Sequence, residues 1–249
     1  MKHLLICRYA AYASIALAAT VASVSATATA LLTNLVVNGD AETNPGSGYS
    51  NTVVPSGWTT TSNFTAALYS VGGSSDLNTA DSAAVGGGLN FFSGGLSNGL
   101  STAMQLINIS DLAASIDAGG LTAAFSALIG GYANQGDNIV INAIFQDALH
   151  GTLSTQTLGP VTATDRGNQS ELLARSTNSL VPTGARFVEI LMTSTRLDGS
   201  YNDGYADNLS FMLRGDVTPP TSNVPEPGSL ALLSLGLAGL AAIRKRKQA

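Results

Sequence analysis

Short runs in which apolar and polar residues alternate set the strongest limit on how this chain can fold. Residues 209–214 place Leu, Phe and Leu on one face and Ser, Met and Arg on the other. A period of two residues is typical of a half-buried β-strand. The same reasoning predicts strands at 34–38, 64–71, 103–109, 121–129, 139–146, 153–157, 171–175, 187–192 and 209–214, with one short helix at 110–117.

Glycine-rich clusters separate these runs and predict turns. Many short strands at fairly even spacing, with little helical period, favour a β-sandwich. Residues 31–215 are long enough for one large β domain with its own core. The expected turns are at 72–73, 86–88, 94–95, 119–120, 130–131 and 198–199.

The N-terminus has the three parts of a secretory signal. Lys2, His3 and Arg8 are basic, residues 9–24 are uncharged and largely apolar, and small residues fill 25–30. We expect cleavage after Ala30, giving a signal peptide at 1–30. An uncleaved N-terminal anchor is the alternative.

The C-terminus has a different three-part order. Val224-Pro225-Glu226-Pro227 precedes an apolar run at 228–243, and Arg244, Lys245, Arg246 and Lys247 follow it. Sixteen helical residues span about 24 Å, which is short of the roughly 30 Å hydrocarbon core, so the run predicts a marginal transmembrane helix. The basic cluster stays cytoplasmic by the positive-inside rule. Residues 216–223, with Pro219-Pro220, are then a linker to this tail at 224–249.

This tail closely resembles the PEP-CTERM sorting signal of Gram-negative bacteria. The resemblance implies processing by an exosortase near the Pro-Glu-Pro motif, in a bacterium that makes extracellular polysaccharide. The protein is then exported, held transiently at the inner membrane, and passed to the cell surface or extracellular matrix. An ordinary C-terminal membrane anchor is the alternative.

The composition of residues 31–215 limits the partners of the domain. Cleavage removes Cys7, the only cysteine, so no disulfide can form. The segment has five Arg, no Lys and fourteen Asp plus Glu, a net charge of −9. This charge argues against nucleic acid and anionic lipid partners, and is compatible with neutral ligands and divalent cations.

The domain has too few histidines and cysteines for a zinc or copper site, and a Ser-His-Asp catalytic triad would have to use His150. His150 is the one histidine left after cleavage, and zinc or copper sites need several His or Cys ligands. His150 lies between two expected strands and is interpreted as a turn residue. A glycosidase would need two carboxylates across a cleft, and no motif joins Asp137, Asp147, Glu171 and Glu189 in pairs.

Hard oxygen ligands cluster at both ends of the domain, at 38–42 and 202–208. If the terminal strands lie side by side, Asp40, Glu42 and Asp207 come together and predict a structural Ca²⁺ site. Three carboxylates without a cation would be costly. The alternative is that these Asp and Asn residues only form turns.

The same ends resemble the galactose-binding-like jelly rolls of carbohydrate-binding modules. The resemblance lies in the opening residues 34–42, in Gly57-Trp58 and in the closing residues 205–211. It implies a jelly-roll sandwich whose calcium uses Glu42 and Asp207. Ala41 stands where the family has an aromatic residue.

A sugar site needs aromatic faces beside polar groups. Trp58 is the only tryptophan, and Tyr205 is a weaker candidate for ligand contact. A lone Trp in a sandwich can equally belong to the core.

We therefore expect a non-catalytic, carbohydrate-binding-like surface or matrix protein associated with an exopolysaccharide. A purely structural matrix protein is the alternative, and a glycoside-acting enzyme ranks third.

Overall fold

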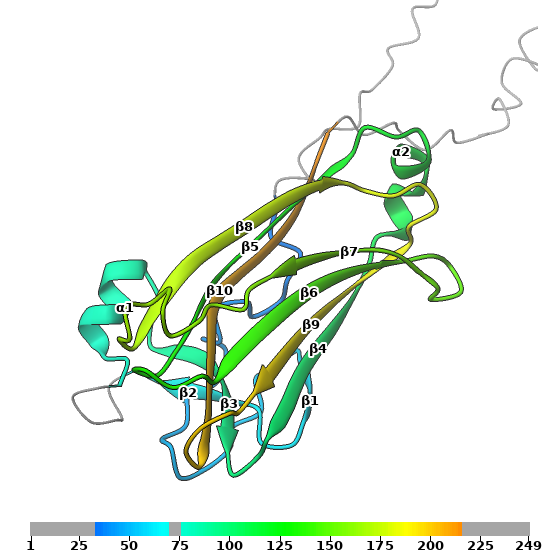
Figure 1. The fold of residues 1–249 in the computed structure, drawn as a ribbon. Helices are drawn as coiled ribbons and strands as arrows, with labels where there is room; N and C mark the ends of the chain where they lie inside the picture. Colours follow the sequence, from blue (N-terminus) through cyan, green and yellow to red (C-terminus); the bar gives the residue numbers. More distant parts are fainter. Residues whose placement is uncertain (1–32, 70–75, 216–249) are drawn as a thin grey trace, which may run out of the picture.

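Two five-stranded antiparallel sheets pack face to face in the computed structural model, which describes residues 33–69 and 76–215 (Figure 1). The sheet that we call the β10 sheet has the order β2-β3-β10-β5-β8, and the β9 sheet has the order β1-β4-β9-β6-β7. The strands are β1 (Thr59–Thr61), β2 (Thr65–Leu68), β3 (Asn90–Leu96), β4 (Leu100–Asn108), β5 (Thr122–Gly131), β6 (Asn138–Gln146), β7 (Thr152–Leu158), β8 (Glu171–Leu180), β9 (Phe187–Thr195) and β10 (Tyr201–Arg214). The helices are α1 (Thr79–Val85), η2 (Ser110–Leu112) and α2 (Ala113–Asp117).

Strands β3 to β10 follow a jelly-roll path. The order β3-β10-β5-β8 in one sheet faces β4-β9-β6-β7 in the other. The chain changes sheet at every connection in this series except the β6–β7 hairpin. Two interlocked Greek keys of this kind define a jelly roll. The predicted all-β jelly-roll sandwich is confirmed.

The main core lies between the sheets and comes from the predicted alternation. On β9, Val188, Ile190 and Met192 are fully buried, while the residues between them face outward. Phe211 of β10 packs against Phe125 and Phe145, with ring centroids 6.0 and 5.9 Å apart. Every residue of the buried clusters lies between Val36 and Leu213, so the domain buries a core of its own.

The outer face of the β10 sheet carries a second apolar cluster. On β10, Ala206 points into the main core and Tyr205 points to the opposite face, because successive side chains of a strand alternate. Leu77, just before α1, joins this cluster, and α1 lies close to the start of β8 (Figure 1). The cluster consists of Ala67, Tyr69, Leu77, Phe91, Leu172 and Tyr205.

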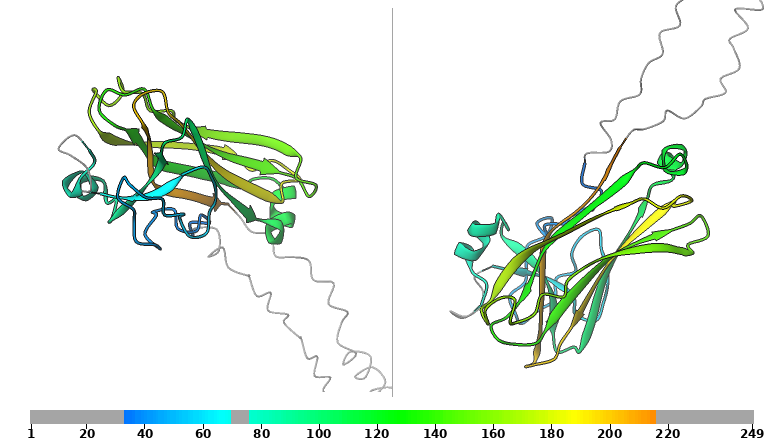
Figure 2. Two further views of the ribbon diagram at one scale, coloured as in Figure 1. Left: turned by 90° about the horizontal axis from the view of Figure 1, so that it is seen from below. Right: turned by 45° about the horizontal axis from the view of Figure 1, so that its top comes forward.

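The two ends of the domain lie side by side, as the sequence predicted. Leu35 N–H donates to the Phe211 carbonyl at 2.9 Å, and Leu209 N–H donates to the Gly39 carbonyl at 2.8 Å. The start and end of the described chain therefore leave the sandwich at the same end (Figure 2). The predicted strand at 34–38 is wrong, because this segment forms turns. The Asn34 amide there bonds β10 by its side chain instead, accepting from Phe211 N–H and donating to the Leu209 carbonyl.

Two of the expected glycine turns lie inside strands. Gly94 and Gly95 belong to β3, and Gly130 and Gly131 belong to β5. A Cβ at Gly95 would overlap the Asn63 carbonyl oxygen, so these glycines permit close backbone approach rather than a turn. The prediction missed β3 for this reason.

One helical segment was predicted from the sequence and one was missed. Residues 110–117 fold into η2 and α2, as expected. Helix α1 was not predicted, although Asn78 and Asp81 form a reciprocal capping box at its start. The signal peptide at 1–30, the linker at 216–223 and the tail at 224–249 lie outside the described residues.

Candidate functional site

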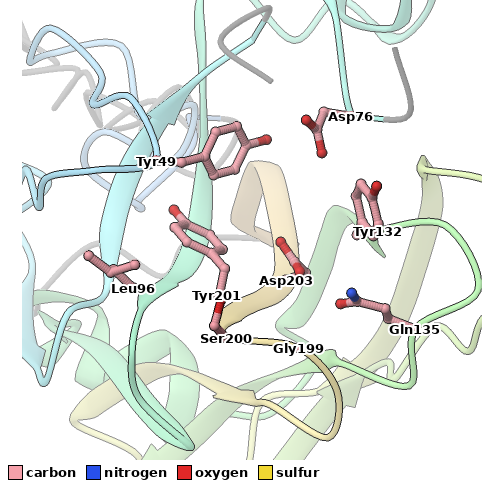
Figure 3. Close-up of a pocket in the computed structure, with 9 residues that line it drawn as sticks. All are labelled: Tyr49, Asp76, Leu96, Tyr132, Gln135, Gly199, Ser200, Tyr201 and Asp203. Carbon is pink, nitrogen blue, oxygen red and sulfur yellow. The ribbon is translucent and has the colours of Figure 1, made fainter. Parts of the chain in front are cut away.

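A cavity of about 380 Å³ opens at the start of β10, between the β5–β6 loop and the segment that precedes β1 (Figure 3). We call it the tyrosine pocket, because three of its side chains are tyrosines. Its volume lies within the range of roughly 300–1,000 Å³ that is usual for small-molecule sites. The lining residues are Tyr49, Asp76, Leu96, Tyr132, Gln135, Gly199, Ser200, Tyr201 and Asp203.

Strand β10 supplies the floor of the pocket by its alternation. Asn202 points into the sandwich, where its Oδ1 accepts from Ser194 Oγ at 2.7 Å. Tyr201 and Asp203 therefore face outward, on the same side as Tyr205. The Tyr205 hydroxyl donates to Asp203 Oδ1 at 2.6 Å, which fixes the orientation of this carboxyl group.

Buried Asp137 holds the loops around the pocket together. Its Oδ1 accepts from the N–H groups of Leu197 and Asp198 at 2.6 and 2.8 Å, and its Oδ2 accepts from Asp203 N–H at 2.9 Å. Asp198 Oδ2 in turn accepts from Gly136 N–H at 2.7 Å. The β9–β10 turn and the β5–β6 loop are thus joined by charge-assisted hydrogen bonds, which favour a preformed site.

Arg166 shapes the wall that carries Tyr132 and Gln135. Its side chain is 2% exposed, and its guanidinium donates to the carbonyls of Gly131, Ala133, Gln135 and Gln169. The guanidinium therefore lies inside the loop and acts as a clamp on its backbone.

Three buried polar atoms of the pocket have no hydrogen-bond partner within the described part of the chain. They are the hydroxyls of Tyr49 and Tyr201 and the Oε1 atom of Gln135. The two tyrosine rings meet edge to face with centroids 4.9 Å apart. Burial raises the pKa of Tyr201 to about 12 and raises the pKa of Tyr49 further. Both phenols therefore stay protonated and can donate to a ligand.

The acidic groups of the pocket interact with one another. Burial raises the pKa of Asp203 to about 7, and the charges of Asp137 and Asp76 add to this, while the Tyr205 hydroxyl and Arg166 oppose it. Figure 3 shows the side chains of Asp76, Asp203, Tyr132 and Gln135 around the same space.

Of the predicted calcium residues, Asp207 lies farther along β10, and Glu42 and Asp40 lie near enough for their charges to act on it. Asp207 is fully buried, and its Oδ2 accepts from the Tyr69 hydroxyl at 2.7 Å. Burial raises the pKa of Asp207 to about 8, and the nearby charges of Glu42 and Asp40 raise it further. Glu42 Oε1 accepts from the N–H groups of Leu89 and Asn90, both at 2.7 Å. Asp40 is exposed at the rim.

Acidic side chains and glycines meet at this place. Two glycines lie directly against the carboxylates, since a Cβ at Gly87 would come within 2.8 Å of Asp207 Oδ2 and one at Gly88 within 2.5 Å of Glu42 Oε1. Within residues 33–69 and 76–215, no three His, Cys, Asp or Glu side chains converge as a ready metal-binding group. A calcium ion here would need backbone carbonyls or water besides Glu42 and Asp207.

Trp58 and Tyr205 do not present a ring to a ligand. Trp58 is 6% exposed, stacks edge-on against Phe92 at 5.5 Å and donates its indole N–H to the Asn38 carbonyl. Tyr205 is 0% exposed and contacts Phe91 at 4.9 Å. Both rings are covered by protein, so the expectation of a sugar-stacking face at these residues is not met. Tyr205 instead positions Asp203 from beneath the tyrosine pocket.

His150 and the carboxylates that were considered for a glycosidase make contacts within turns and strands. His150 is a turn residue with a φ of 63° and stacks on Phe187 at 4.5 Å, as its interpretation as a turn predicted. Asp147 accepts backbone N–H groups in the same hairpin. Glu189 accepts from Gln146 on the outer face of the β9 sheet, and Glu171 begins β8.

Comparison with known families identifies the motif at the C-terminus. A family model described as the PEP-CTERM protein-sorting motif matches residues 223–247. The chain carries a PEP-CTERM sorting motif. Residues 224–227 and 244–247 lie within the match and outside the described residues. A PEP-CTERM motif implies export and exosortase-mediated sorting to the surface.

The predicted membrane anchor also lies in the C-terminal part of the chain that the structure does not describe. Over residues 33–69 and 76–215, no helix combines the length and the apolar composition that a bilayer span requires. The apolar run at 228–243 lies outside this range.

Solved structures with similar folds were found, whereas comparison with curated proteins gave no match. The enzymatically active domain of tailspike protein 4 of bacteriophage CBA120 is 15% identical at a TM-score of 0.43, covering 73% of this chain and 21% of that one. A family 16 carbohydrate-binding module is 16% identical at a TM-score of 0.39, and the match covers 72% of this chain and 99% of the module. The CBM22-1 xylan-binding domain from Paenibacillus barcinonensis Xyn10C is 9% identical at a TM-score of 0.36, and the match covers 69% of this chain and 94% of that domain. The chain thus spans about a fifth of the tailspike chain.

Proposed function

We propose that this protein is an exported, exosortase-processed surface or matrix protein whose jelly roll binds a glycan without cleaving it, in association with an extracellular polysaccharide. The observation that carries the proposal is the tyrosine pocket. It combines tyrosine rings with an unpaired amide acceptor and two aspartates in one preformed cavity.

This combination suits a sugar ring. A sugar has apolar C–H faces and a belt of hydroxyl groups, so it needs flat apolar surfaces next to donors and acceptors. Tyrosine offers both a ring and a hydroxyl, and Gln135, Asp76 and Asp203 add the acceptors. The unpartnered hydroxyls of Tyr49 and Tyr201 can gain the hydrogen bonds they lack when a ligand enters, which favours binding.

The position of the pocket supports a surface role. It lies at the start of β10, while the C-terminal tail follows the end of the same strand. A strand of 14 residues at about 3.3 Å per residue is roughly 46 Å long. A tail held at the membrane would therefore leave the tyrosine pocket facing away from it.

A glycan array with residues 31–215 tests the binding role directly. The proposal expects retention of at least one glycan by the wild-type domain and its loss in Tyr132→Ala. Absence of binding to every glycan, with the domain shown to be folded, would favour the purely structural matrix role.

Hydrolysis is a second candidate because Asp76 and Asp203 face one cavity, and a raised pKa such as that of Asp203 is a property of general acids. Incubating a bound glycan with the protein and measuring new reducing ends separates the two functions. Our proposal expects none. Product formation that disappears in Asp203→Asn would establish the enzyme instead.

We propose a structural calcium ion at Asp207 and Glu42, with Asp40 at its rim. The support is the buried negative charge at this place and the glycine cradle around it. An ion that binds only the folded state stabilises it, by about 2.7 kcal/mol at a hundredfold excess over Kd. Chelation should therefore lower the Tm by several degrees, since each kcal/mol is worth roughly 2–4 °C in a domain of this size.

Two variants make the calcium test specific. Asp207→Ala should abolish the shift in Tm that chelation causes, because it removes a ligand. His150→Ala should keep the shift, because imidazole is a poor calcium ligand. If calcium and chelator leave the Tm of the wild-type domain unchanged, the acidic cluster holds no ion.

The sorting role is tested in cells. Replacing Glu226 and Pro227 by Ala should leave export intact and stop removal of the tail, because the apolar run remains while the recognition motif is lost. Release of mature-sized protein at the normal rate from this variant would contradict exosortase processing.

A further inference from the structure

We propose that the outer face of the β9 sheet packs against the same face of a second copy of this chain, so that the domain forms a symmetric dimer in solution. The inference goes beyond the proposed function and does not depend on it.

The outer face of the β9 sheet is unusually apolar. On β4, β9 and β6 the residues between the buried ones point outward, and the outer face of an antiparallel sheet is commonly polar. Six of these outward residues are apolar instead, and none belongs to either buried cluster of the domain. We call them the apolar face, which consists of Met104, Leu106, Val140, Ile144, Phe187 and Leu191.

Leu191 lies at the centre of this face. It is the fifth of the nine residues of β9, and β9 is the middle strand of its sheet (Figure 1). The strand register places Met104 and Asn142 on either side of it, with Leu106 and Ile144 in the next row. A two-fold axis near Leu191 therefore brings the apolar residues of both copies together.

Polar side chains on the same face bond to one another. Thr157 Oγ1 donates to Asn142 Oδ1 at 2.7 Å, and Gln146 Nε2 donates to Glu189 Oε2 at 3.0 Å. Burying a polar group is costly when it has no hydrogen-bond partner. These groups keep a partner when a second protein covers them, which lowers the cost of forming an interface.

The charge of the face favours one orientation of the second copy. Glu189 is the one charged residue among the outward positions of β4, β6 and β9, whereas the domain as a whole has a net charge of −9. With a two-fold axis through Leu191 and across the strands, Glu189 lies opposite Thr193 of the second copy, and Ile144 lies opposite Val140. The two Glu189 carboxylates are then offset by about 13 Å along the strands, which exceeds the Debye length of about 8 Å at physiological ionic strength.

The composition of the face argues against two other occupants. A glycan-binding surface needs accessible aromatic rings, but Phe187 is the one aromatic residue among these outward positions, and His150 stacks on it at 4.5 Å. An anionic membrane attracts Lys and Arg, and these positions hold neither. A second copy supplies the same flat apolar surface, as a symmetric interface requires.

The area of the face is sufficient for a dimer. A nine-residue strand is about 30 Å long and five strands span about 24 Å, so each copy offers roughly 700 Å². A standard interface buries about 800 Å² per partner. Two sheets that stack face to face about 10 Å apart can bury most of this area.

The proposed symmetry also places the two tyrosine pockets. Each pocket includes Gly199 and Ser200, from the turn that follows the end of β9. Since the β9 strands of the two copies run in opposite directions, the pockets lie at opposite ends of the dimer. One dimer can then hold two separate ligand chains.

Sedimentation velocity with residues 31–215, which contain both buried clusters, tests the inference. We expect the wild-type domain to sediment as a dimer at about 50 µM, since interfaces of this size reach micromolar or lower dissociation constants. Leu191→Asp sets two carboxylates against each other at the axis and should weaken association at least about tenfold. Leu180→Asp is the matched control, because Leu180 is 68% exposed on β8 of the other sheet, and it should remain a dimer.

A cross-linking variant keeps the test independent of folding defects in Leu191→Asp. Residues 31–215 contain no cysteine, so Leu191→Cys introduces a single thiol. A short bis-maleimide should join two copies of Leu191→Cys and leave Leu180→Cys uncoupled. Thermal melting of each variant verifies that it is folded.

The contrary outcomes are specific. A wild-type domain that stays monomeric, or a folded Leu191→Asp variant that stays dimeric, overturns the inference. Equal cross-linking of Leu180→Cys and Leu191→Cys overturns it as well. If the wild type is monomeric and Leu191→Asp loses glycan retention, the face binds glycan instead of a second copy. Failure of the dimer alone leaves the tyrosine pocket standing, because Tyr132→Ala is its test.

Discussion

Arg166 is the residue on which the wall of the tyrosine pocket depends most. Replacing it by Met leaves the carbonyls of Gly131, Ala133 and Gln135 without their donor. Unsatisfied buried groups cost roughly 1–3 kcal/mol each, with partial relief from water, so we expect Arg166→Met to destabilise the domain by about 3 kcal/mol. Urea unfolding measures this. Arg175→Met is the control, because the Arg175 guanidinium donates to the neighbouring Ala174 carbonyl in an exposed hydrogen bond. Equal stability of the two variants would contradict the clamp.

Asp203 gives the stability of the domain a pH dependence of known sign. Its pKa in the folded protein is about 7, above the ordinary value of 3.8, so the folded state holds a proton that the unfolded state releases. Stability should therefore fall as the pH rises from about 4 to about 7. The buried group faces Tyr205, Asp137, Asp76 and Arg166.

Urea unfolding in the presence of a chelator, at a pH of about 5 and of about 8, measures this effect. Since one pKa unit corresponds to about 1.4 kcal/mol, we expect the wild-type domain to lose about 1–3 kcal/mol more than Asp203→Asn between these values. Asp111→Asn, at an exposed residue of η2, should behave as the wild type. A wild-type domain that gains stability toward the higher pH would contradict the assignment.

Only part of the site could be predicted from single residues. The proximity of Glu42 and Asp207 followed from the expectation that the ends of a jelly roll meet. The tyrosine pocket could not be found in this way, because Tyr49, Tyr132 and Tyr201 come from three separate segments with no common spacing. Burial of Trp58 also depends on packing against Phe92, which no local pattern reveals.

At the scale of secondary structure, period-two alternation was the reliable signal. The strands with clear alternation, such as β6 and β9, were predicted within a few residues. Strand β3 was missed because its glycines were interpreted as a turn, and β10 is longer than predicted because polar Asn202 and Asp203 lie within it. In both strands the tertiary neighbours, rather than local propensity, decide the conformation.

Substitution of Gly95 tests whether tertiary neighbours decide the conformation of β3. Its φ is +88°, and a Cβ there would overlap the Asn63 carbonyl oxygen. Gly95→Ala should lower the free energy of unfolding by about 2–4 kcal/mol, from backbone strain and overpacking together. Gly99→Ala is the matched control, because a Cβ there meets no atom within 4 Å, and it should change the stability little. Similar melting curves for the two variants would contradict the packing role.

At the scale of the whole molecule, the two ends of the chain and the domain between them give separate kinds of information. The sorting motif was recognisable from sequence because the order of its parts is itself the signal, and the family match at 223–247 agrees with it. The sandwich was predictable because its strands alternate. Its ligand was not, because a binding site depends on where loops from distant segments meet.

The central claim is that the tyrosine pocket, and no other face of the sandwich, holds the glycan. Calorimetric titration of an array-positive glycan into wild type, Tyr132→Ala and Leu106→Ala tests it most directly. Leu106 is 46% exposed on the outer face of the β9 sheet, so it reports on binding to that face. We predict that Tyr132→Ala loses more than about 1 kcal/mol of binding free energy, as truncation of a contact residue does, while Leu106→Ala binds as the wild type. Full binding by Tyr132→Ala, or a loss confined to Leu106→Ala, would contradict the account.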